Sequence, residues 1–242
     1  MPGRLEEIAG CWAEAAGIDP GLLPSPDVLR ERFGAGDGPC LPPADPRRVA
    51  AWEHRYGFVL PRGLRAWMLL SEGFSHNGSL IHPLTAIGPM IPFASVPNLV
   101  VQPESWFELG NPEAETVCID LAYRWPGACC PIFTSGDDQN QSLPRVIAPS
   151  FEAWFVRLLH EGGRVYWFDP GFVPLGDPWC EHRTHAPVPP LPERLRRLAE
   201  CVLPLMRPGA DERDIALALG IDRGDVEVLL RYLQHQDEVA QD

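Results

Sequence analysis

The spacing of apolar residues changes along this 242-residue chain, and this change constrains the fold more than any other feature. Up to about residue 73, apolar residues recur every three or four positions, as on the buried face of a helix. From Ser79 to Val146 they form short runs separated by turn residues such as Gly110-Asn111-Pro112. Such runs are typical of an antiparallel sheet of about four to six short strands. We therefore expect an α+β fold, with a meandering antiparallel sheet flanked by helices.

Local signals indicate where the main helices begin and end. Asp45-Pro46 combines an N-cap acid with a proline at the first helical position, and Gly57 is suited to ending that helix. A second helix is expected to begin at Pro61 and to end near Glu72, and Ser150 is expected to cap a third. The strands are expected at 80–81, 96–101, 106–107, 116–121, 129–134 and 145–148.

Proline-rich stretches and changes of pattern suggest four parts. They are an N-terminal helical arm at 1–44, an α+β domain at 45–170, a proline-rich linker at 171–191 and a C-terminal helical module at 192–242. The arm is expected to pack on the main domain. The linker assignment depends on the run from Pro187 to Pro192, because such segments are extended and semi-rigid.

The net charge of −13 restricts the partners that this chain would bind. A field of that sign repels phosphate backbones and anionic lipids, so a basic protein is favoured over nucleic acid or a membrane. No apolar run reaches the roughly 18 to 20 residues of a membrane helix. The first residues do not show the basic start and apolar run of a secretory signal, and the seven cysteines include no Cys-x-x-Cys pair. We expect a cytoplasmic protein in a reducing compartment.

Several short motifs occur in order between about residues 45 and 160. They are Trp52-Glu53, Tyr56-Gly57, Leu60-Pro61, Trp67, Leu70, Gly73, Ile81-His82-Pro83-Leu84, Val117-Cys118-Ile119-Asp120-Leu121 and Ala148-Pro149-Ser150-Phe151-Glu152-Ala153-Trp154. Their order resembles the SUKH superfamily, the Smi/Knr-type domain. The resemblance implies an α+β fold without a cofactor and a non-enzymatic role. In bacteria, such a domain implies an immunity protein that neutralises a toxin; in fungi, it implies a regulator of cell-wall synthesis.

The candidate partner surface consists of acids and one aromatic residue that we expect to be exposed between strands. These residues are Glu104, Trp106, Glu108, Glu113, Glu115, Asp137 and Asp138. The acids would steer a basic toxin domain towards the surface and raise the association rate. Trp106 is either an interface anchor or a core residue, and the pattern alone leaves both interpretations open.

Two enzyme-like interpretations remain as alternatives. Cys180, His182 and His185 form a Cys-x-His-x-x-His pattern, but structural zinc takes four ligands and no fourth lies near. Cys180 and His182 would also suit a nucleophile and its base, although alternate positions of an extended backbone point to opposite faces. No Gly-x-Ser-x-Gly, His-Glu-x-x-His or phosphate-loop motif is present. We therefore predict a binding protein without a metal or cofactor.

A DNA-associated regulator is the other alternative. A helix-turn-helix pair is indicated by two segments, 211–219 and 222–235, which a turn at Gly220 connects. A recognition helix normally offers basic side chains or amides to DNA. Residues 191–242 instead hold seven arginines against eleven acids, a net charge of −4. This balance favours a small helical module that packs on a protein.

Overall fold

The structure, a computed structural model, places most of the chain in helices, strands and defined connections. It describes residues 4–34, 39–76, 79–90, 103, 105–110, 115–122, 130–136, 143–185, 191, 193–205, 212–222, 224–226, 228–230 and 232–233. These residues belong to two compact units, one ending at residue 185 and one beginning at residue 191. The predicted strand at 96–101 lies outside the described residues.

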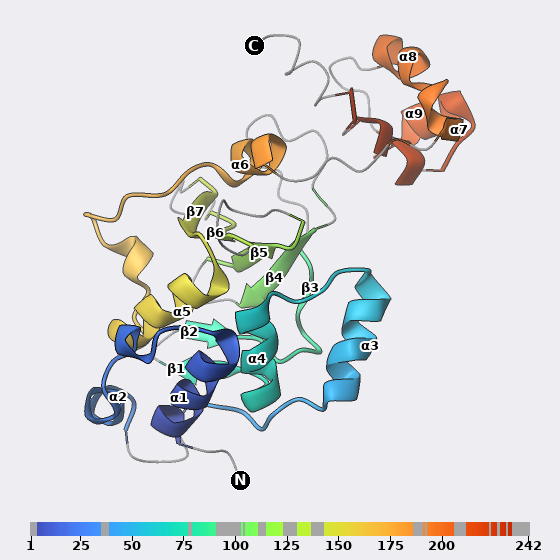
Figure 1. Cartoon of the computed structure of the whole chain (residues 1–242). Coiled ribbons are helices and arrows are strands. Elements are labelled where there is room, and N and C mark those ends of the chain that lie inside the picture. The colour runs from blue at the N-terminus through green and yellow to red at the C-terminus, as the bar shows by residue number, and fades with distance from the viewer. Residues whose placement is uncertain are drawn as a thin grey trace. The chain divides into compact units, whose positions relative to one another are not determined.

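The first unit contains both helices and strands (Figure 1). Its helices are α1 (Leu5–Ala16), η1 (Pro20–Leu22), α2 (Pro26–Phe33), α3 (Pro46–Tyr56), α4 (Arg62–Leu70), α5 (Phe151–His160), η2 (Tyr166–Phe168) and α6 (Pro178–His185). Its strands are β1 (Phe74–His76), β2 (Ser79–Ile81), β3 (Gly88–Pro89), β4 (Trp106–Gly110), β5 (Val117–Asp120), β6 (Ile132–Thr134) and β7 (Arg145–Ala148).

The strands form a hairpin and a meander. β1 pairs with β2, and the larger sheet has the order β3-β4-β5-β6-β7 with antiparallel neighbours throughout. Strand order in the larger sheet therefore follows chain order, as in an antiparallel meander. The predicted α+β class and the predicted antiparallel meander are both confirmed.

The two faces of the larger sheet have different neighbours. One face contributes Phe107, Ile119 and Ile132, which are in register on adjacent strands. These side chains belong to the core shared with α1, α3, α4 and α5. Because successive side chains of a strand alternate between faces, Trp106 and Cys118 lie on the opposite face. We call the first face the helix face and the second the outer face.

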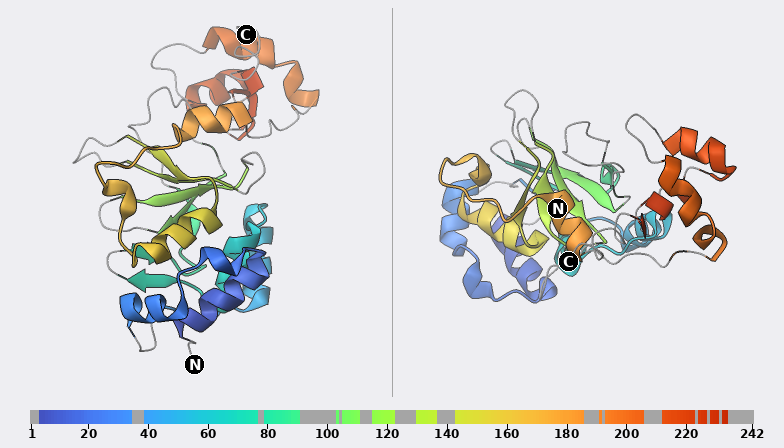
Figure 2. Two further views of the ribbon diagram at one scale, coloured as in Figure 1. Left: turned by 60° about the vertical axis from the view of Figure 1, so that its left-hand side comes forward. Right: turned by 90° about the horizontal axis from the view of Figure 1, so that it is seen from above.

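The N-terminal arm completes the core on the helix face. α1 packs beside α4, as the views in Figures 1 and 2 show. The fully buried ring of Trp12 lies edge-on to Phe155 at a centroid distance of 5.1 Å, and its Nε1 donates to the Gly63 carbonyl at 2.8 Å. A side chain at position 63 would begin 2.1 Å from Glu152 Oε1, so a larger residue there would displace the Glu152 side chain.

The predicted helix starts are explained by their caps. The Asp45 carboxylate accepts the Arg47 N–H at 2.8 Å, and Ser150 Oγ accepts the Ala153 N–H at 3.1 Å. Gly57 ends α3 with a φ of 72°, in the left-handed region that glycine adopts readily. Each cap provides a partner for a backbone group that the first or last helical turn leaves unpaired.

The structure differs from the sequence prediction at several elements. Residues 178–185 lie within the predicted linker but form α6, and the pattern did not predict the short strands β1 and β3. At the start of the predicted helical module, two short helices at 193–196 and 199–202 are separated by a turn at residues 197–198. Among the described helices, none combines the length and apolar character needed to cross a bilayer.

The second unit is a small helical module with its own apolar core. It contains α7 (Glu193–Arg196), α8 (Ala199–Val202), η3 (Leu203–Leu205) and α9 (Glu212–Leu219), followed by helical residues at 224–226, 228–230 and 232–233. Its buried core consists of Leu191, Leu195, Ala199, Val202, Ile215, Val226, Leu229, Leu230 and Leu233.

Candidate functional site

The residues predicted to form a partner surface do not share one environment. Four of them lie outside the described residues: Glu104, Glu113, Asp137 and Asp138. Trp106 and Glu115 are each only 1% exposed, so the expectation that Glu115 is an exposed acid is wrong, and Trp106 is not on the surface. Glu108 on β4 is partly exposed, with its Oε1 3.2 Å from His82 Nε2.

Trp106 is buried because it begins β4 on the outer face of the sheet. Its ring lies 4.8 Å from that of Phe133 on β6, and its Nε1 donates to Asp120 Oδ2 at 3.1 Å. This burial agrees with the core interpretation of Trp106. The indole N–H finds its partner inside the protein, as buried tryptophans usually require.

Asp120, the last residue of β5, is the centre of a buried hydrogen-bond network. Its Oδ1 accepts Ser105 Oγ at 2.7 Å and the Ala122 N–H at 3.0 Å, while Oδ2 accepts Trp106 Nε1 and faces His182 Nδ1. We call Ser105, Trp106, Asp120 and His182 the Asp120 cluster. Burial by itself raises the pKa of Asp120, but the charge of His182 and the hydrogen bonds from His182, Ser105 and Ala122 outweigh it and lower the pKa.

The Asp120 cluster contains the residue types of a catalytic triad in a different arrangement. In a triad, the serine donates to the histidine, and the aspartate orients the histidine from behind. Here Ser105 and His182 both bond to Asp120, and all three side chains are buried. The His182 ring also stacks on Trp179 at 6.0 Å. The arrangement therefore fixes α6 to the outer face of the sheet.

The proposed metal ligands diverge on α6. His182 is buried against Asp120, whereas Cys180 is exposed. Two positions along a helix correspond to roughly 200° of rotation, so these side chains leave on opposite sides. The side chain of His185 lies outside the described residues. Within the part of the chain that the structure describes, no group of three His, Cys, Asp or Glu side chains is placed to hold a metal ion.

A pocket of about 440 Å³ opens beside Glu115, on the side of the molecule that carries η2. Its lining residues are Glu115, Arg145, Trp167, Phe168, Asp169, Pro170 and Phe172. We call it the Glu115 pocket. It combines aromatic walls with a small number of charged groups, the composition typical of binding sites.

The polar groups of the Glu115 pocket come from segments far apart in the sequence. Glu115 Oε2 accepts the Trp167 indole N–H at 3.0 Å, across 52 residues, and Oε1 lies 3.4 Å from Arg145 Nη2. The buried Nε of Arg145 has no hydrogen-bond partner among the described residues. The Arg145 side chain as a whole is 25% exposed and lines the pocket, and a guanidinium carries five N–H groups, so it retains donor capacity there.

Exposed apolar side chains occur along residues 168–175, a segment that begins in the pocket lining and continues past it. Phe168 is 41% exposed, Leu175 46% and Val173 78%. The Leu175 N–H donates to the Val146 carbonyl at 2.9 Å, and the Val146 N–H donates to the Gly176 carbonyl at 2.9 Å. These two bonds hold the segment along the free edge of β7, so the apolar side chains project from an ordered backbone.

A second ion pair lies at the rim of the pocket. Arg164 Nη2 donates to Asp169 Oδ2 at 3.0 Å, and Arg164 Nη1 also contacts the same carboxylate. The hydrogen bonds from Arg164 lower the pKa of Asp169, so Asp169 stays ionised near neutral pH. Both carboxylates of the pocket lining are thus adjacent to arginines.

In the second unit, an acid of the predicted recognition helix has a structural partner. Asp225 is buried, and its two oxygens accept Arg194 Nη1 and Nη2 at 2.6 and 2.7 Å. This bidentate pair links the helical segment at 224–226 to α7. DNA binding by this module stays a prediction.

Sequence reasoning identified Glu115 but missed its partners. The aromatic run Tyr166-Trp167-Phe168 was a usable signal, since three consecutive aromatic residues outside a predicted element need a place to pack. Arg145 and His182 gave no comparable signal of their contacts. A scan against models of known protein families finds no match to this chain, and a search of curated proteins finds no significant similarity.

Proposed function

We propose that this chain is a non-enzymatic, SUKH-type protein-binding module that binds a basic protein partner, such as a toxin domain. The partner would dock around the Glu115 pocket, on a surface that we call the docking face and define by Phe168, Val173 and Leu175. The observation that carries the proposal is an aromatic pocket with an exposed apolar side chain in its lining, Phe168, and two more in the segment that follows, Val173 and Leu175. Apolar side chains grouped around a pocket are characteristic of interaction surfaces.

The docking face is preorganised, which favours binding. Trp167 is held by Glu115, and the Tyr166 hydroxyl donates to the Ile147 carbonyl at 3.3 Å. Residues 175 and 176 are bonded to β7. Because the segment is ordered before a partner arrives, little conformational entropy would be lost on association.

The charge of the chain supports a basic partner. A net charge of −13 attracts a positively charged domain over distances of about one Debye length, roughly 8–10 Å at physiological salt. Such steering mainly raises the association rate, while buried apolar contacts provide most of the affinity. The acidity and the apolar docking face would therefore contribute to different steps of the same event.

Local contacts give physical roles to residues that carry the SUKH resemblance. The Glu53 carboxylate accepts the Leu60 N–H at 3.1 Å and lies 3.3 Å from Arg65 Nε. It thereby connects the end of α3, at Gly57, to the start of α4. A glutamate, a glycine and Leu-Pro in this order are compatible with one helix–turn–helix corner, which supports the family proposal.

Capture from a lysate of the native host tests the docking face. We expect the tagged chain to retain a basic protein that a Val173→Asp variant fails to retain, because a charge at the centre of an apolar interface is costly. The matched control is Val59→Asp, since Val59 is 66% exposed and does not line the pocket. Equal capture by all three proteins, or duplex DNA as the captured molecule, would contradict the proposal.

A further inference from the structure

We propose that the Glu115 pocket accepts one uncharged apolar side chain of the partner, with the backbone carbonyl of the same residue accepting a hydrogen bond from Arg145. This inference rests on the proposed protein-binding function and specifies the chemistry of its central contact. It differs from the long-range preference for a basic partner, because it concerns the single residue that enters the pocket.

The charges of the pocket favour a neutral side chain. Glu115 lies beside Arg145, and Asp169 is paired with Arg164. An entering lysine, arginine, aspartate or glutamate would therefore find no uncompensated opposite charge. It would still lose hydration, and this loss makes the burial of an unpaired charge unfavourable.

The walls and the size of the pocket favour an apolar side chain. Trp167, Phe168 and Phe172 contribute aromatic rings, and Pro170 adds a further apolar surface. The volume of about 440 Å³ lies in the range of roughly 300 to 1,000 Å³ that is usual for pockets that bind small ligands. A leucine-like or aromatic side chain would bury its surface there without leaving a polar group unpaired.

Arg145 adds a requirement for a hydrogen-bond acceptor. Its contact to Glu115 is long, at 3.4 Å, and its side chain is 25% exposed at the pocket. A carboxylate ligand would approach Glu115 and Asp169 and be repelled by them. A peptide carbonyl accepts from the guanidinium without that repulsion, so an extended peptide segment satisfies both the apolar walls and the arginine.

The test titrates the full chain with three blocked residues, N-acetyl-leucinamide, N-acetyl-argininamide and N-acetyl-aspartate amide. Binding is followed by NMR through the indole N–H of Trp167, which is assigned from its loss in a Trp167→Phe variant. We expect millimolar binding of the leucine probe and binding about tenfold weaker for both charged probes, because their charges must be desolvated. Tighter binding of the arginine or aspartate probe, or no binding of the leucine probe, would overturn the inference.

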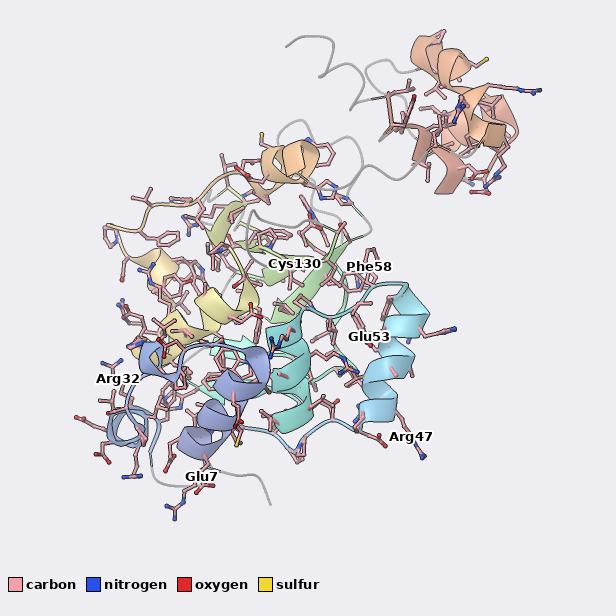
Figure 3. The ribbon with its side chains drawn as sticks, in the orientation of Figure 1. Glu7, Arg32, Arg47, Glu53, Phe58 and Cys130 are labelled. Carbon is pink, nitrogen blue, oxygen red and sulfur yellow. The ribbon has the colours of Figure 1, made fainter. Side chains whose placement is uncertain are left out.

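Two variants separate the apolar and polar parts of the site. Arg145→Met should weaken the leucine probe about tenfold, since it removes a charged hydrogen-bond donor but keeps a long apolar chain. Phe168→Ala removes one wall at a residue that is 41% exposed and is expected to leave the fold intact, so a several-fold loss tests the pocket even if Arg145→Met unfolds. Arg47→Met on α3 is the matched control (Figure 3). Unchanged binding in Phe168→Ala would exclude the pocket as the probe site.

These outcomes are distinguishable from a failure of the proposed function. If the leucine probe does not bind while Val173→Asp still abolishes partner capture, the docking face stands and the pocket inference is wrong. If the probe binds but the Val173→Asp and Val59→Asp variants capture the same amount of partner, the proposed docking face is wrong. The inference then fails as well, because no partner is docked at the pocket.

Discussion

Asp120 and Glu115 are two buried carboxylates near opposite ends of β5, and each accepts a hydrogen bond from a tryptophan indole. Asp120 also accepts Ser105 Oγ and the Ala122 N–H, and it faces His182. Glu115 has a long contact to Arg145 and borders an open pocket. One carboxylate is therefore enclosed by its donors, whereas the other lies next to space that a ligand can enter.

This difference shows how one type of side chain can serve either stability or binding. The Asp120 cluster is closed by α6, and its hydrogen bonds satisfy groups that would be costly to bury alone. At the Glu115 pocket, the Nε of Arg145 has no partner among the described residues, and exposed apolar side chains lie at Phe168 and in the segment that follows the lining. We expect changes at Asp120 to act on the fold and changes around the Glu115 pocket to act on binding.

The largest expected effect is that of Asp120→Ala. The substitution leaves His182, Ser105 and the Trp106 indole buried without their acceptor, so the free energy of unfolding should fall by about 3–5 kcal/mol. Urea denaturation followed by tryptophan fluorescence measures this loss. Asp169→Ala, whose carboxylate is 40% exposed and pairs with an exposed arginine, is the control and should lower the midpoint much less. Equal effects of the two variants would show that the Asp120 cluster does not hold α6.

A smaller loss is expected for Glu115→Gln. The amide oxygen still accepts the Trp167 N–H, but Arg145 loses its counter-charge, and we expect a loss of about 1–3 kcal/mol. The same denaturation experiment measures it, with Glu108→Gln as a partly exposed control of the same chemistry. A loss greater than that of Asp120→Ala would reverse the proposed division between the two carboxylates.

The pH dependence of stability should reveal the contribution of Asp120. The pKa of Asp120 is lowered from its ordinary value of 3.8, so its folded form holds the proton less tightly than the unfolded chain does. Its contribution is therefore fully present well above 3.8 and is lost as the pH falls through the lower, folded pKa. We expect the difference in unfolding free energy between wild type and Asp120→Asn to shrink as the pH falls below about 4. A constant difference down to acid unfolding would contradict this assignment.

The smallest effect on stability should come from Val173→Asp. Val173 is 78% exposed, and exposed substitutions away from structural features usually change stability by less than about 0.5 kcal/mol. Thermal unfolding of this variant should therefore match that of wild type while partner capture is lost. A large drop in the melting temperature would mean that Val173 has a structural role, and the capture experiment would then need Leu175→Asp in its place.

Local sequence signals predicted the elements that depend on neighbouring residues. Asp45 and Ser150 cap the helices that follow them, and Gly57 ends α3, because each acts on backbone groups within a few residues. The meander was predictable because short apolar runs between turns favour antiparallel neighbours. In contrast, α6 has no strong apolar periodicity of its own, and its position depends on contacts such as the one between His182 and Asp120.

The candidate sites were less predictable because their partners are distant in the sequence. Glu115 was expected to be an exposed acid because it lies between turn residues and a strand. It is buried because Trp167, 52 residues later, donates to it from η2. Trp106 had two open interpretations, and the core interpretation agrees with its position between Phe133 and Asp120.

The sequence by itself determined the α+β class, the meander and the helix caps, because apolar periodicity and capping act over a few residues. It also determined the net charge of −13, because this charge is the sum of the basic and acidic residues in the chain. The tertiary structure alone decided which acids are buried, which histidine holds α6 and where an aromatic pocket opens. Those features depend on packing between segments separated by 30 to 62 residues, as the contacts of Glu115 with Arg145 and of Asp120 with His182 illustrate.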